Sequence, residues 1–198
     1  MSEEAQRITG VARDEHRARG FGFWEYALAE SVEAAPSTRR ALLHAALRHN
    51  SDDTIQFELP LQDFVHALEE GDFYDLPARN IVSLTSIADR WDGREPWHLP
   101  MLDLGLAEGD AGLVASVDAL VELGAHGAIF ASGRSYHFVG DRLLSPREML
   151  SFLARAQLLS PIVDSRWVTH QLIDGRCGLR ISTDIEKHNA VHTLAALI

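Results

Sequence analysis

Hydrophobic residues recur along this chain with two different periods, and the two periods predict both helices and strands. Apolar residues that return every three or four positions indicate an amphipathic helix, and apolar residues that alternate with polar ones indicate a half-buried strand. Helices are predicted over residues 21–32, 38–49, 61–70, 110–124, 145–157, 164–175 and 184–198. Strands are predicted over residues 80–87, 97–104, 128–131, 136–139, 142–144 and 177–183.

Local signals support two of these elements strongly. Two β-rich runs are joined by Ser132-Gly133, which is typical of a β-hairpin. Ser145, followed by Pro146 and by Glu148, has the spacing of a capping box at the start of a helix. Because helices and hairpin strands are intermixed, we predict an α+β fold, with a mixed or antiparallel sheet flanked by helices.

The chain divides into three segments on the same pattern. Residues 1–20 are charged and predict a polar lead, either a frayed helix or disordered. Residues 21–78 predict an N-terminal helical layer, and residues 79–198 predict the α+β core. The helical layer is acidic, so it is either a solvated surface or a contact surface for a partner protein.

Charge and composition narrow the class of protein. The 198 residues carry a net charge of −11, which argues against a protein that coats nucleic acid nonspecifically. Residues 132–187 depart from this trend, because they hold eight basic residues against six acidic ones. No apolar run is long enough to span a membrane and no secretory signal is visible. The single cysteine, Cys177, fits a reducing compartment, so we expect a cytoplasmic protein.

Three groups of polar residues stand at the ends of predicted strands. Asp103 ends the second strand, with Glu108 shortly after it, and Asp184 follows the last strand. The hairpin carries a hydroxyl, a guanidinium and an imidazole, and a further guanidinium stands near the end of the last strand: Ser132, Arg134, His137 and Arg180. Guanidinium groups suit phosphate, and carboxylates suit Mg²⁺. The alternative for each is an ordinary turn cap, surface ion pair or strand histidine.

The order of these segments resembles the catalytic core of the archaeo-eukaryotic primase (primase-polymerase) superfamily. That family has an apolar strand ending in Asp-x-Asp, a Ser-Gly…His hairpin, and a later apolar strand ending in an acidic or polar residue. The corresponding segments here are Met101-Leu-Asp-Leu-Gly, Ser132-Gly-Arg-Ser-Tyr-His and Leu179-Arg-Ile-Ser-Thr-Asp. Gly105 stands where the family has its second aspartate, so the chain is most similar to the single-aspartate group.

The resemblance implies an RRM-like sheet and a set of roles for these residues. Asp103, His137 and Asp184 would be catalytic, and Asp103 and Asp184 would hold Mg²⁺ or Mn²⁺. Ser132, Arg134, His137 and Arg180 would bind phosphates of a nucleotide triphosphate or a nucleic-acid end. The implied activity is nucleotidyl transfer of the primase or polymerase type, weak or lost because the first motif is degenerate. The single-aspartate group also implies a mobile-element or defence context.

Two other functions remain open on the residues alone. One is a non-catalytic adaptor on the same fold that uses the acidic helical layer to contact a partner protein or a second copy of the chain. The other is a metal-dependent hydrolase, because Asp184, His188 and His192 would share one face of the predicted last helix. No nucleophile elbow and no phosphate-binding P-loop motif occurs in the sequence.

Overall fold

The computed structural model describes residues 7–14, 35–37, 39–40, 43, 47, 54–60, 80–88, 95–181 and 192–198. The strands are β1 (Arg7–Asp14), β2 (Thr54–Pro60), β3 (Asn80–Thr85), β4 (Ile87–Ala88), β5 (Trp97–His98), β6 (Met101–Leu104), β7 (Gly127–Ala131), β8 (Tyr136–Gly140), β9 (Gly178–Arg180) and β10 (Thr193–Leu197). The helices with defined bounds are α5 (Asp110–Leu123), α6 (Pro146–Gln157) and α7 (Ser165–Asp174).

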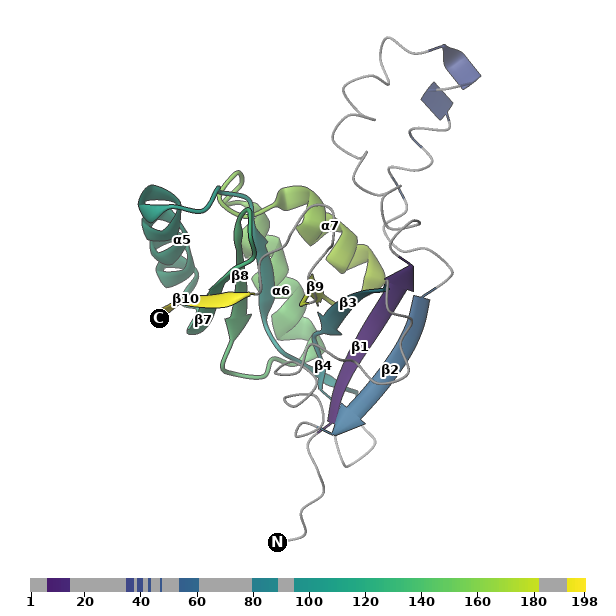
Figure 1. Cartoon of the computed structure of the whole chain (residues 1–198), viewed down its shortest axis with the longest axis horizontal. Helices are drawn as coiled ribbons and strands as arrows, with labels where there is room; N and C mark the ends of the chain where they lie inside the picture. The colour runs from purple at the N-terminus through teal and green to yellow at the C-terminus, as the bar shows by residue number, and fades with distance from the viewer. Residues whose placement is uncertain are drawn as a thin grey trace, which may run out of the picture.

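Two four-stranded antiparallel sheets form the framework of the described part of the chain (Figure 1). One sheet has the order β10-β7-β8-β6, and the other has the order β2-β1-β3-β9. The short strands β4 and β5 form a separate antiparallel pair. The two larger sheets approach each other where β6 contacts β9. The prediction of an α+β fold is therefore confirmed.

The core lies between the β10-β7-β8-β6 sheet and its helices. Leu102, Ile129 and Phe138 are completely buried side chains on the strands, and Leu120 and Val168 are completely buried on the helices. The alternation of the strands explains this arrangement, because every second residue faces the helices. The same alternation directs the residues between them, including Asp103 and His137, to the other face.

Helix boundaries follow the local signals. Ser145 caps α6 through a complete capping box with Glu148, and Asp164 caps α7 by accepting two backbone N–H groups. Gly124 ends α5 in a left-handed conformation, with φ of 68°, which glycine adopts without steric cost. The α5 helix begins at Asp110, as predicted, and Gly109 is its N-cap.

The described part of the chain departs from the predicted elements in several places, among them the predicted strand over 142–144, where only Leu144 forms an isolated bridge, to His98. The predicted helix over residues 184–198 is wrong at its end, because Thr193–Leu197 is strand β10, paired with β7. The predicted helical layer is wrong at Thr54–Pro60, which is strand β2, and the predicted polar lead contains strand β1; the two strands pair with each other. Pro100 divides the predicted strand over 97–104 into β5 and β6, because proline lacks the N–H that a ladder needs. The proposed three-segment division itself stays a prediction.

Candidate functional site

Asp103 and His137 face each other across neighbouring strands. They are paired in the register of β6 and β8, and Nε2 of His137 lies 3.9 Å from Oδ1 of Asp103. The His137 side chain is 10% exposed, whereas that of Asp103 retains 29%. The first and second sequence motifs therefore meet at one face of the β10-β7-β8-β6 sheet.

A second histidine, His192, completes a row of polar groups on this face. Its Nε2 lies 3.2 Å from Nδ1 of His137, and the two ring centroids are 4.9 Å apart. Because a hydrogen bond between two imidazoles needs one protonated nitrogen, the two rings share one proton at this contact. The sequence analysis placed His192 on a helix face, and only the pairing of β10 with β7 brings it to His137.

Arg180 connects the third motif to the second. It belongs to β9 of the other sheet, and its Nη2 donates to the backbone oxygen of Ser132 over 3.0 Å. Burial raises the pKa of Asp103, and the positive charge of Arg180 partly opposes that rise. The end of β9 therefore lies beside the hairpin. The hypothesis that Arg180 and the hairpin residues bind the same phosphates needs this proximity.

The hairpin turn is held by a hydrogen bond within the turn and by two hydrogen bonds with Glu108. The Ser132 hydroxyl, which is buried, donates to the backbone oxygen of Ser135 over 3.1 Å, so its single proton is used within the turn. The Gly133 N–H donates to Oε1 of Glu108 over 2.6 Å, and the Glu108 N–H donates to the backbone oxygen of Arg134 over 3.1 Å. The Arg134 residue is exposed at the tip of the turn. Glu108 therefore holds the hairpin turn through its Oε1 and its backbone N–H.

Asp103 has an unusual acidity. Removal from water and, to a smaller extent, the nearby charge of Asp164 raise its pKa, and the charge of Arg180 lowers it, so that the pKa moves from 3.8 to about 7. Asp164 reaches this position because its N–H donates to the backbone oxygen of Asp103 over 3.0 Å. In the sequence, Asp164 stands at the start of the helix predicted over residues 164–175, and no local pattern indicates that it lies near the first motif.

The position of the missing second aspartate is closed. A Cβ at Gly105 would lie 2.8 Å from the backbone oxygen of Pro161, closer than real Cβ contacts. The Gly105 N–H donates to the backbone oxygen of Ile162 over 2.8 Å, so this loop is fastened against the end of β6. The loop that carries Asp164 thus occupies the space that a side chain at position 105 would need.

The described residues supply only part of a metal site. No group of three metal-ligating side chains gathers anywhere in the described ranges. Asp103 offers a partly exposed carboxylate, whereas Asp164 uses Oδ1 to cap α7. Asp184 and His188, which the sequence analysis named as ligands, lie outside the described residues. The zinc-site hypothesis requires His192 to lie on a helix that continues to residue 198. His192 instead directly precedes strand β10, so its predicted place on a helix face is wrong.

Cys177 is part of the core and not of the site. Its side chain is completely buried, and burial raises its pKa. Its backbone N–H donates to Oγ of Ser86 over 2.9 Å, and Ser86 Oγ lies 3.1 Å from Nδ1 of His98. Burial lowers the pKa of His98, so this cluster is a neutral, buried network.

The two antiparallel sheets bring Asp103, His137 and Arg180 close together, so that a carboxylate, an imidazole and a guanidinium group share one place. Residues 60–193 match the family model described as AEP-like, archaeo-eukaryotic primase 1D-like. The match covers more than half of the chain, and the chain therefore belongs to the archaeo-eukaryotic primase-like family. Comparisons with curated proteins and with solved structures give no match. In the described residues, no helix has the length and apolar character that crossing a membrane requires.

Proposed function

We propose that this chain binds the phosphates of a nucleotide triphosphate, or of a nucleic-acid end, at the Asp103–His137 face. The observation that carries the proposal is the contact of Arg180 with the Ser132 backbone beside the paired Asp103 and His137. Three motif segments distant in the sequence thereby supply a carboxylate, an imidazole and a guanidinium group to one place. Guanidinium groups bind phosphate oxygens through paired hydrogen bonds, which makes phosphate the best-matched ligand.

Each residue has a separate task in this proposal. Arg180 and Arg134 clamp phosphate charge, and His137 contacts a phosphate oxygen. Ser132 shapes the turn, because its hydroxyl proton already serves Ser135. Asp103 and Asp184 would hold Mg²⁺ or Mn²⁺, which would neutralise phosphate charge when bound.

We further propose that nucleotidyl transfer is weak or lost. The two-metal form of this chemistry needs carboxylates that bridge both ions. The space at Gly105 is closed by the Pro161 backbone, so a second strand-end carboxylate is not available there. The non-catalytic adaptor stays a second prediction, and its proposed contact layer lies largely outside the described residues.

Isothermal titration with a nucleotide triphosphate and Mn²⁺ at pH 8 tests the proposal, because Asp103 is then mostly ionised. The wild type should bind, and Asp103→Ala should lower the affinity at least tenfold. Asp118→Ala, an exposed carboxylate on α5, is the matched control and should bind like the wild type. Absence of binding by the wild type, or equal binding by Asp103→Ala, would refute the proposal.

A further inference from the structure

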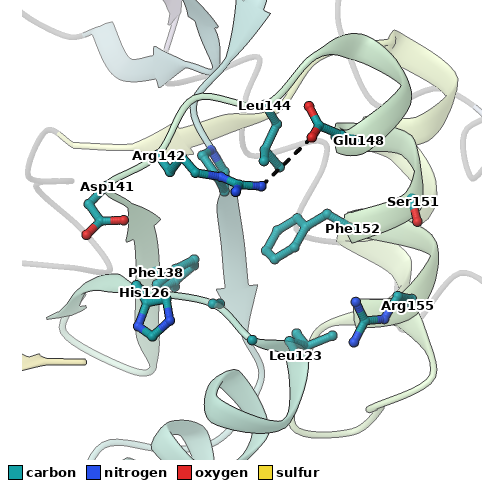
Figure 2. A pocket seen from close by; sticks show the side chains of 13 residues that line it. Leu123, His126, Phe138, Asp141, Arg142, Leu144, Glu148, Ser151, Phe152 and Arg155 are labelled. Carbon is teal, nitrogen blue, oxygen red and sulfur yellow. Dashed lines mark ion pairs between the residues drawn. The ribbon is translucent and has the colours of Figure 1, made fainter.

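A cavity of about 530 Å³ lies against the face of the sheet that carries Phe138 (Figure 2). Phe138 lines it, and because adjacent residues of a strand face opposite sides, His137 points away from it. One wall is α6, another is the end of α5 with the loop that follows, and the third is the loop after β8. The volume is within the range of about 300–1,000 Å³ that is usual for sites of small organic ligands.

The floor of the cavity is apolar and aromatic. Phe138 and Leu144 are buried, while Phe152 on α6 is only half-buried and points into the cavity (Figure 2). The rings of Phe138 and Phe152 lie 6.5 Å apart and are tilted by 40°. A flat apolar group that covers Phe152 would remove apolar surface from water, which is favourable in proportion to the area covered.

The rim carries positive groups on both sides of Phe152. Arg142 lies on one side and Arg155 on the other (Figure 2). The acidic neighbour Glu148 is already engaged, because its Oε2 accepts the N–H and the O–H of Ser145, over 2.8 Å and 2.7 Å. These bonds lower the pKa of Glu148, so it stays a carboxylate that belongs to the α6 cap.

The two guanidinium groups are therefore available to a ligand. Arg142 is paired with Glu148 only at 3.9 Å, and its side chain remains 76% exposed. Arg155 has no carboxylate within ion-pair distance in the described part of the chain. The remaining acid of the rim, Asp141, is exposed and lies near His126, at a distance from Arg155 in the view of Figure 2. Positive charge on an apolar floor suits a ligand that combines an anion with a flat ring.

We propose that this cavity is a second ligand site, which binds a small organic anion. A flat ring packs against Phe152, and a phosphate or carboxylate on that ring is held by Arg155, with Arg142 as a further donor. A nucleoside monophosphate and an aromatic carboxylate both have this chemistry. The site is separate from the Asp103 face and does not depend on the function proposed there.

Binding of four probes to the full chain tests the proposal, followed by the shifts of backbone amide resonances. Adenosine 5′-monophosphate and 2-naphthoate each carry a ring and an anion, whereas adenosine and inorganic phosphate each carry only one of the two. At least one of the first pair should bind at least tenfold more tightly than both single-feature probes, and should shift amides of α6 and of the loop after β8. The stronger of the two identifies phosphate or carboxylate as the preferred anion.

Variants separate this site from its neighbours. Arg155→Gln should weaken binding about tenfold, because the positive charge that holds the anion of the ligand is lost. Arg155 is exposed, so the substitution leaves the core undisturbed. Arg147→Gln, an exposed arginine of the same helix outside the cavity, is the matched control and should bind like the wild type. Asp103→Ala should also retain this binding, so that failure here and failure of the nucleotide proposal are distinguishable. The proposal would be overturned if neither adenosine 5′-monophosphate nor 2-naphthoate bound, or if the amide shifts were confined to the Asp103 face. Equal binding by the two arginine variants would also overturn it.

Discussion

Replacing Asp103 by asparagine should make the protein more stable above neutral pH, although it removes the central residue of the candidate site. Asp103 is held in a place where its charged form is disfavoured, so its pKa rises from 3.8 to about 7. Between these values the folded state keeps a proton that the unfolded state has released. The free energy of unfolding of the wild type therefore falls as the pH rises from about 4 to about 7. Asparagine cannot ionise, so the variant avoids this loss.

The size of the effect follows from the shift of the Asp103 pKa. One pKa unit corresponds to about 1.4 kcal/mol, so a shift from 3.8 to about 7 sets an upper limit of roughly 4 kcal/mol. The side chain retains 29% of its exposure, and water near the carboxylate reduces the penalty. We therefore expect Asp103→Asn to stabilise the protein by about 2 kcal/mol at pH 8 and by almost nothing at pH 4.

Urea unfolding at pH 4, 6 and 8, with a chelator present to remove divalent metals, measures this difference. Asp164→Asn provides the internal control, because asparagine keeps the α7 cap while removing the charge that raises the pKa of Asp103. In that background the gain from Asp103→Asn should be smaller. A gain that does not depend on pH, or a variant no more stable than the wild type at pH 8, would refute the reasoning.

Three further changes test single contacts. Gly105→Asp, which restores the family's second aspartate, should destabilise the protein by about 1–3 kcal/mol in thermal unfolding, because a Cβ there meets the Pro161 backbone at 2.8 Å. Glu108→Ala should accelerate hydrogen exchange of the Gly133 amide roughly tenfold, since a bond to a charged acceptor is lost. Ser145→Ala should lower the free energy of unfolding by about 1 kcal/mol through loss of the α6 cap.

Each of these changes has a control in the same part of the chain. Gly105→Ala should also destabilise the protein. If the alanine variant were as stable as the wild type, the contact with the Pro161 backbone would not be the cause. Glu108→Gln keeps an acceptor for the Gly133 N–H, so exchange as fast as in the alanine variant would contradict the proposed bond. Ser151→Ala, within α6 and away from its cap, should change stability by less than about 0.5 kcal/mol.

Elements whose ends are marked by local chemistry could be predicted well. The hairpin follows from its short Ser-Gly turn, and α6 follows from the capping box of Ser145 with Glu148. These signals act between residues a few positions apart, so the surrounding fold does not alter them. The order of the three motifs was likewise sufficient to predict the primase-like family, which the family model confirms.

Strand β10 shows where such reasoning fails. Thr193–Leu197 consists largely of alanine and leucine, which favour helices when considered alone. Pairing with the edge of β7 satisfies the backbone of this segment, and that long-range contact overrides the weak local preference. The same pairing brings His192 to His137, so the error in secondary structure hid a member of the site.

Residue types and their order along the chain were enough to predict the candidate groups: Asp103 for a metal ion, and His137, Arg134 and Arg180 for phosphate. Only the packing of the loop before α7 against β6 decided that Asp164 lies close enough to raise the pKa of Asp103 and that no side chain fits at Gly105. The physical reason is that acidity and steric space depend on atoms within a few ångströms, whichever part of the sequence supplies them.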